Sequence, residues 1–142
     1  MVVRLAQWTL DVRDVELMAA FWSKALGYRV EVGGDGCAKL YPPGDTAPEV
    51  PTLWLQATSD EKRGKNRDHP DMRPQDGDVD SEVGRLVALG AQHVDVGQTG
   101  KESFVVLADP EGNEFCVLRR EPRQVSLLAT RDEESPGQPN LG

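Results

Sequence analysis

The feature of this chain that most constrains its fold is a pattern that occurs twice. Residues 4–12 alternate between apolar and polar side chains, as a half-buried strand does, and a segment with helical spacing of apolar residues follows and ends at Gly27. The same order returns in the second half, where a helical pattern ends at Gly90 before three more strand candidates. Each half has the order strand, helix, strand, strand, strand, which predicts an internal repeat.

Short local signals mark where the elements begin and end. Asp14 and Asp78 precede the two helical patterns as N-caps, because a carboxylate accepts the free amide hydrogens of a first helical turn. Pro70 weakens the first strand of the second half, because proline donates no ladder hydrogen bond. The expected strands are 4–12, 28–32, 37–41, 52–57, 67–73, 91–96, 104–108 and 114–119.

A single domain is expected over residues 1–120, because one unit of about 60 residues makes a marginal core and two units can share one. Module one spans about 4–57, the linker 58–66 and module two about 67–120. The fold class is α+β: two tandem βαβββ modules form a curved mixed sheet with a concave cleft, and the helices lie outside. The remaining residues, 121–142, are polar and are expected to be largely disordered.

The composition argues against several classes of partner. The chain has 142 residues and a formal net charge of −8, which disfavours binding to a nucleic-acid backbone. No apolar run approaches the roughly 18 residues of a membrane span, and the N-terminal stretch lacks the apolar core of a signal peptide. Two cysteines, Cys37 and Cys116, are too few for a disulfide framework. We therefore expect a cytoplasmic protein that binds neither nucleic acid nor membrane.

Three motifs in this order resemble one known family. They are Asp11-Val12-Arg13-Asp14-Val15, the linker Lys65-Asn66-Arg67-Asp68-His69 and the closing Asp109-Pro110-Glu111-Gly112-Asn113-Glu114-Phe115-Cys116-Val117-Leu118. Over about residues 4–120 the chain resembles the vicinal oxygen chelate superfamily, which includes glyoxalase I, bleomycin-resistance proteins, fosfomycin-resistance enzymes and extradiol dioxygenases. The linker and the closing strand look most like its glyoxalase-like domain branch. The resemblance implies a small-molecule ligand and a homodimer.

The resemblance also implies where a divalent metal would be held. Each half of a metal-binding member supplies one ligand from its first strand and one from its last, and the matching positions here are Gln7, Gln56, His69 and Cys116. Only His69 is a usual ligand at these positions. Two neutral amides are weak donors, so no cofactor is expected; the alternative is a zinc ion held by His69 and a Cys116 thiolate.

Strand alternation adds further candidates on the cleft face, because residues two apart share a side of a sheet. His69 is the candidate general base, and Cys116 is a candidate nucleophile whose pKa a nearby histidine would lower. Each also has a structural explanation, as a hydrogen-bonded cleft histidine and as a small buried hydrophobic residue, while Trp54 is either an aromatic platform or ordinary packing. The expected ligand-binding residues are Gln7, Thr9, Trp54, Gln56, Asp71 and Glu114.

Three functions are consistent with these residues. The first is an enzyme that lacks the usual metal and uses His69 for proton transfer to or from a small molecule. The second is a non-catalytic protein that sequesters its ligand, like the bleomycin-resistance proteins. The third is a metal-dependent lyase or dioxygenase. The departures from the usual ligands favour a metal-free site, and they leave the choice between catalysis and sequestration open.

Overall fold

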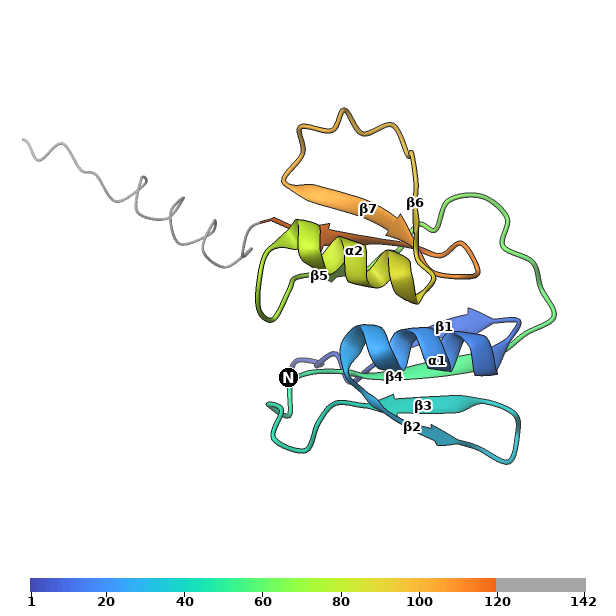
Figure 1. The fold of residues 1–142 in the computed structure, drawn as a ribbon. Coiled ribbons are helices and arrows are strands. Elements are labelled where there is room, and N and C mark those ends of the chain that lie inside the picture. Colours follow the sequence, from blue (N-terminus) through green and yellow to red (C-terminus); the bar gives the residue numbers. More distant parts are fainter. Residues whose placement is uncertain (120–142) are drawn as a thin grey trace, which may run out of the picture.

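The computed structural model describes residues 1–119, which form the two expected modules (Figure 1). Module one contains β1 (Gln7–Val12), α1 (Val15–Leu26), β2 (Arg29–Val32), β3 (Ala38–Tyr41) and β4 (Thr52–Ala57). Module two contains β5 (Asp71–Met72), α2 (Val79–Leu89), β6 (Gln92–His93), β7 (Phe104–Ala108) and β8 (Glu114–Leu118).

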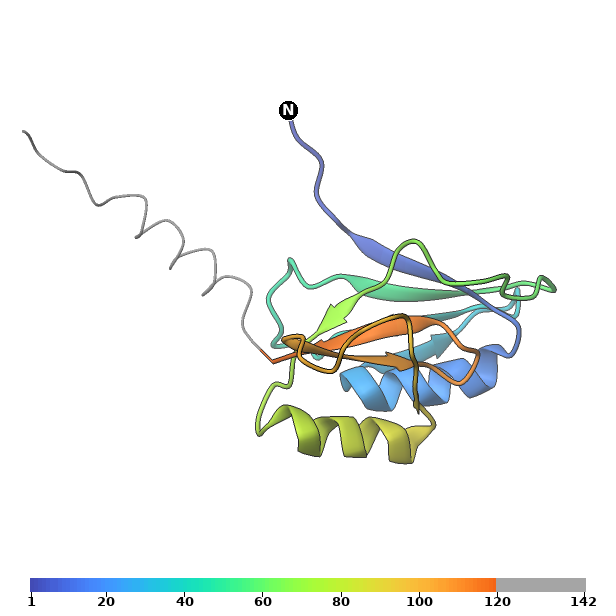
Figure 2. The ribbon, with the colours of Figure 1, turned by 90° about the horizontal axis from the view of Figure 1, so that it is seen from above.

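Each module folds its strands into a four-stranded mixed sheet. The strand orders are β1-β4-β3-β2 and β5-β8-β7-β6, so the first and last strands of each module pair in parallel. The expected α+β fold with tandem modules is confirmed, and its hydrogen-bonded ladders form two sheets. Both helices lie on the same side of these sheets (Figure 2), which leaves the opposite faces open.

The helix boundaries follow from the caps that the sequence predicts. The Asp14 carboxylate accepts a hydrogen bond from Leu17 N at 3.0 Å, and the Asp78 carboxylate accepts one from Ser81 N at 2.8 Å. Gly27 ends α1 in the left-handed conformation, with φ of 70°, which a residue with a side chain adopts only at a cost.

The core forms between the helices and the covered faces of the sheets. Strand alternation turns Leu53 and Leu55 of β4 toward α1, and it turns Phe115 and Val117 of β8 the same way. The Trp22 ring of α1 packs edge-on against Phe115, with centroids 5.1 Å apart. The two modules therefore share one hydrophobic core, since these rings come from different halves.

Polar contacts also join the two modules. Trp22 Nε1 donates to the buried Asp109 carboxylate at 3.1 Å, and the Glu111 carboxylate accepts hydrogen bonds from the backbone amides of Arg13 and Asp14. On the helix side, Arg85 of α2 donates to the carbonyls of Lys24 and Ala25 at the end of α1. Each contact satisfies groups that a helix end or a buried ring leaves unpaired.

Three strands are clearly shorter than the sequence predicts, and the first of them, expected at 4–12, covers only Gln7–Val12 because residues 4–6 are exposed and lie outside the ladder with β4. The strand expected at 67–73 is reduced to Asp71–Met72, because Pro70 precedes it and offers a carbonyl but no amide hydrogen. The strand expected at 91–96 covers only Gln92–His93, and the chain then leaves the edge of the sheet. The predicted disorder of 121–142 lies outside the described residues. Within residues 1–119, neither helix is long and apolar enough to cross a bilayer.

Candidate functional site

A small cavity lies against the open face of the module-two sheet. Its volume is about 240 Å³. Its apolar wall comes from β7, from the end of β8 and from the loop after β6, and its polar end comes from the linker, β5 and β8. The apolar lining residues are Val96, Phe104, Val106 and Leu118, and the polar ones are Lys65, His69, Asp71, Glu114 and Cys116.

Three of the predicted residues meet at the polar end of this cavity. Parallel pairing sets Asp71 of β5 opposite Cys116 of β8, and His69 precedes Asp71 by two residues on the same strand path. His69 Nδ1 lies 3.8 Å from Asp71 Oδ1, and the donor atoms of all three residues lie within 4.8 Å of one another. The His69 and Asp71 side chains keep 38% and 50% of their surface exposed, so both groups are open to a ligand.

The surroundings of Cys116 favour its protonated thiol. Burial raises its pKa, and the Asp71 carboxylate raises it further by its charge and by a hydrogen bond, while the Lys65 charge acts weakly in the opposite direction. A nucleophilic cysteine needs the reverse, a lowered pKa. The environment of Cys116 therefore argues against the nucleophile hypothesis and favours a neutral thiol in the cavity wall.

Glu114 has its carboxylate already engaged. The side chain is 9% exposed, and its oxygens accept from Lys62 Nζ at 2.8 Å and from Asn66 N at 2.9 Å. Burial alone would raise the pKa of Glu114, but the Lys62 ammonium and the backbone amides outweigh it and hold the pKa below its ordinary value. This pair fastens the linker to β8 and neutralises one side of the cavity.

The predicted residues of module one lie elsewhere. Gln7 accepts from Thr52 Oγ1 at 3.3 Å, whereas the Gln56 side chain contacts Trp54 Nε1 at 2.9 Å and Cys37 Sγ at 3.3 Å. The β1–β4 ladder pairs Gln7 with Thr52 and Gln56 with Asp11, four positions further on. At about 3.3 Å per residue the amides stand roughly 13 Å apart along the strands. Neither these residues nor Thr9 lines the module-two cavity.

The four positions that the family resemblance implies for a metal do not all come together in this structure. Gln7 and Gln56 are separated by the strand register, and Gln56 is held by its own neighbours. Of the four positions, only His69 and Cys116 approach one another, and Asp71 joins them. A zinc ion bound by these three residues would have to displace the proton of the Cys116 thiol.

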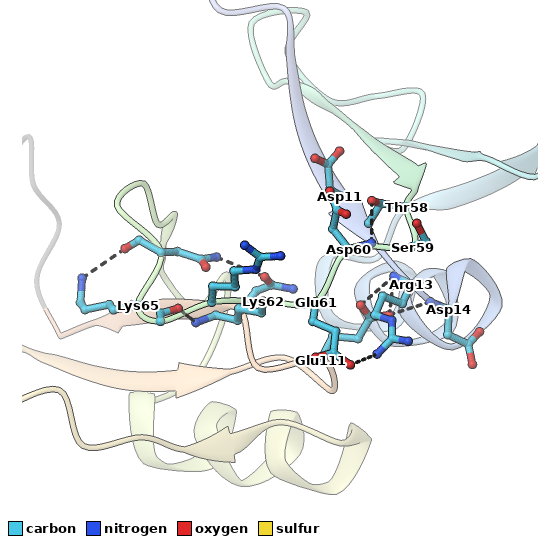
Figure 3. Close-up of a pocket in the computed structure, with 14 residues that line it drawn as sticks. Asp11, Arg13, Asp14, Thr58, Ser59, Asp60, Glu61, Lys62, Lys65 and Glu111 are labelled. Atoms are coloured by element: carbon cyan, nitrogen blue, oxygen red, sulfur yellow. Dashed lines mark hydrogen bonds and ion pairs between the residues drawn. The ribbon is translucent and has the colours of Figure 1, made fainter.

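A larger hollow lies where the linker passes the ends of β1 and β4. Its volume is about 900 Å³, and charged side chains of both signs line it (Figure 3). Many of these groups are already paired within the chain: Arg13 with Glu61 at 3.3 Å, and the Glu111 carboxylate with backbone amides. This hollow is best explained as the solvated joint between the modules.

Sequence reasoning missed two parts of the site. Lys62 and Lys65 belong to a basic run that is typical of a solvated loop, yet both reach the cavity region from the linker. Phe104 and Val106 share a face of β7 by strand alternation, so that alternation was the available signal for the apolar wall.

Comparisons with known proteins agree with this fold. The model of the glyoxalase-like domain family matches residues 7–118. A mutant of the fosfomycin resistance protein FosX from Listeria monocytogenes, complexed with Mn(II) and 1S,2S-dihydroxypropylphosphonic acid, is 18% identical, with a TM-score of 0.67 over 87% of this chain and 95% of that one. FosX from Mesorhizobium loti is 16% identical, with a TM-score of 0.66 over 89% and 99%.

A third similar structure is a glyoxalase/bleomycin resistance protein/dioxygenase family enzyme from Burkholderia phytofirmans. It is 20% identical, with a TM-score of 0.60 over 81% of this chain and 97% of that one. At these identities the likeness establishes the fold alone. No protein with a curated description matches the chain in sequence.

Proposed function

Because the chain belongs to the glyoxalase-like domain family, we propose that it binds a small molecule in the module-two cavity and acts on it as an enzyme. His69 is the proposed general base. The observation that carries this proposal is the position of its imidazole, which lies at the polar end of an otherwise apolar cavity with the Asp71 carboxylate 3.8 Å away. A base in this position can take a proton from a ligand held against the apolar wall.

The neighbours of His69 suit this role better than nucleophilic attack. Asp71 provides an ion-pair partner for the imidazolium that forms when His69 accepts a proton. The protonated Cys116 thiol adds no competing negative charge. A cavity of about 240 Å³ holds a metabolite-sized ligand rather than a polymer. The FosX structure with a bound dihydroxypropylphosphonic acid is a similar fold that holds a ligand of that size class.

We also propose that the protein is a cytoplasmic homodimer whose ligand-binding groups include the open face of module one. The exposed N-terminal arm supports dimerisation, since Val3 is 97% and Leu5 72% exposed and apolar side chains at such exposure favour a covering partner. On the open face of module one, Gln7, Thr9 and the Trp54–Gln56 pair remain the candidate ligand contacts. The molar mass in solution, compared between the full chain and a chain lacking residues 1–5, tests the dimer.

A screen of metabolite-sized compounds against isotope-labelled protein tests the central proposal. Compounds that bind should shift the amide resonances of β5, β7 and β8. For a compound that is turned over, His69→Gln should lower kcat about 100-fold or more with little change in affinity, as expected on loss of a general base. The matched control is His93→Gln, because His93 is exposed on β6 and lies outside the cavity.

Two results would replace this proposal with one of its alternatives. Tight binding without turnover by the wild type would indicate sequestration. Retention of one equivalent of zinc through dialysis, lost in both His69→Gln and Cys116→Ser, would indicate a metal-dependent enzyme, whose donor groups would be His69, Asp71 and Cys116.

A further inference from the structure

The walls of the module-two cavity are apolar on one side and polar on the other, and this restricts the chemical class of its ligand. Val106 and Phe104 of β7 and Leu118 of β8 make one side, while Lys65 and His69 stand at the other. A benzene ring fills an engineered apolar cavity of about 150 Å³, so this space suits one substituted ring of roughly ten to twelve non-hydrogen atoms. Sugars and other polyhydroxy compounds would leave hydroxyl groups unpaired against the apolar wall.

The charges at the polar end restrict the ligand further. Glu114 is neutralised by Lys62, at 2.8 Å, which leaves the Asp71 carboxylate and the Lys65 ammonium as the charges that face the cavity. Lys65 Nζ donates to Asn66 O at 3.3 Å, and no carboxylate pairs with it among residues 1–119. A ligand that arrives as an anion would meet Asp71, whereas a neutral ligand enters without this repulsion.

A neutral ligand with an acidic hydroxyl group interacts first with His69 and then with Lys65. Its O–H bond breaks, the proton goes to a ring nitrogen of His69, and the electron pair stays on the ligand oxygen. The imidazolium then lies beside Asp71, which is 3.8 Å away, and the new oxyanion lies on the Lys65 side of the cavity. The net charge of the site is unchanged by this transfer, so it requires no outside ion.

We propose that the ligand of this cavity is a small ring compound with one acidic hydroxyl group, whose conjugate base is held by Lys65 after proton transfer to His69. This inference rests on the proposed function and specifies its substrate class. Lys65 thereby joins the candidate catalytic residues that the sequence predicts. Its role differs from that of Lys62, which is committed to Glu114.

The experiment uses 4-nitrophenol, whose neutral and ionised forms absorb at different wavelengths. The full chain is titrated with this probe at a pH where the free probe is mostly neutral. We expect the bound probe to show the absorbance of its anion, with its ionisation equilibrium shifted at least tenfold toward the anion. Nitrobenzene, which has the same ring and no hydroxyl, should bind and should show no dependence on Lys65.

Variants assign the effect to the cavity. Lys65→Met and His69→Gln should each reduce the ratio of ionised to neutral bound probe at least tenfold, whereas the matched lysine control, Lys24→Met in the last turn of α1, should not change it. Val106→Trp should block binding of both probes by filling the cavity. Val106 is only 5% exposed, so a tryptophan there can prevent folding. In that case Val96→Trp provides a second obstruction, because Val96 lies in a loop and is 38% exposed.

The outcomes separate this inference from the proposed function. Binding of 4-nitrophenol in its neutral form would overturn the acidic-hydroxyl class and leave the cavity as a binding site. Failure of both probes to bind, together with metabolites that shift the same β7 and β8 amides, would overturn the ring-compound class alone. Failure of any compound to perturb these amides would overturn both.

Discussion

The two modules have the same order of elements, but they differ in how completely each one is built. In module one, β1 and β4 are six residues long, and α1 buries four side chains. In module two, β5 and β6 have two residues each, and α2 buries only Val83 and Leu86. The cavity lined by His69 and Asp71 nevertheless lies in module two.

We infer from this difference that module one mainly provides structural support, whereas module two holds the cavity. Module one has enough regular structure to serve as a scaffold, and Trp22 extends from it to pack on Phe115 and to donate to Asp109. We expect module two to depend on these contacts, and its short edge strand β5 contains Asp71 and follows His69. Functional sites often lie in such less stable regions.

Removal of the Phe115 ring should have the largest effect on this relationship. Phe115 is 1% exposed and packs against Trp22 and Phe21, so Phe115→Ala should lower the free energy of unfolding by about 3–5 kcal/mol. Urea denaturation measures the total loss. Amide hydrogen exchange should show that β7 and β8 lose protection at a lower free energy than β1 and β4.

Leu53→Ala is the matched control, because Leu53 is equally buried but belongs to β4 of the scaffold. It should reduce protection in both modules together. If Phe115→Ala instead reduced protection equally everywhere, the modules would form one cooperative unit and the distinction between scaffold and dependent module would fail.

The contact between Lys62 and Glu114 should have the next largest effect. Lys62→Met leaves a nearly buried carboxylate without its cation, and we expect a loss of about 3 kcal/mol at neutral pH. Because the pKa of Glu114 is lowered in the folded protein, its stabilisation is present above the ordinary carboxyl range and is lost as pH falls through the folded value. In chemical denaturation between pH 3 and pH 7, the difference in stability between the wild type and Lys62→Met should therefore shrink as pH falls.

The double variant Lys62→Met with Glu114→Gln controls for the loss of the lysine itself. It should recover part of the stability, since no charge remains to be buried. A single Lys62→Met variant as stable as the wild type would show that the linker is not fastened to β8 by this pair.

The sequence predicts local features well because their causes are local. The Asp14 cap and the Gly27 terminus follow from neighbouring residues, and the predicted bounds of β4 agree with the structure. The separation of Gln7 from Gln56 depends on strand register, which no short motif specifies. The approach of His69, Asp71 and Cys116 could be predicted, since alternation and parallel pairing place them on one face.

A smaller loss of stability is expected when the contact between Arg85 and the end of α1, which also joins the two modules, is removed. Arg85 donates at 3.0 Å and 2.9 Å to two carbonyls in the last turn of α1, which would otherwise lack partners. Arg85→Met should lower the free energy of unfolding by about 1.5 kcal/mol in a urea titration. Arg29→Met should lower it by much less, because Arg29 forms an exposed pair with Glu31 and stacks on Tyr41. Equal losses would argue against the contact.

The smallest expected effect is a change in the pKa of the Cys116 thiol in module two. In a Cys37→Ser background, the rate of Cys116 alkylation by iodoacetamide as a function of pH reports the thiol pKa. Burial is the largest cause that raises this pKa, and Asp71 adds to it. Asp71→Asn should therefore lower the midpoint of the alkylation rate against pH without restoring the ordinary thiol pKa. At a fixed pH well below the midpoint, alkylation should become faster, because a lower thiol pKa leaves a larger fraction of reactive thiolate.

Asp95→Asn, in the loop after β6, should leave the midpoint unchanged, since Asp95 does not line the cavity. An unchanged midpoint in Asp71→Asn would mean that the Asp71 charge does not act on the Cys116 thiol, and burial would then be the main cause of its raised pKa.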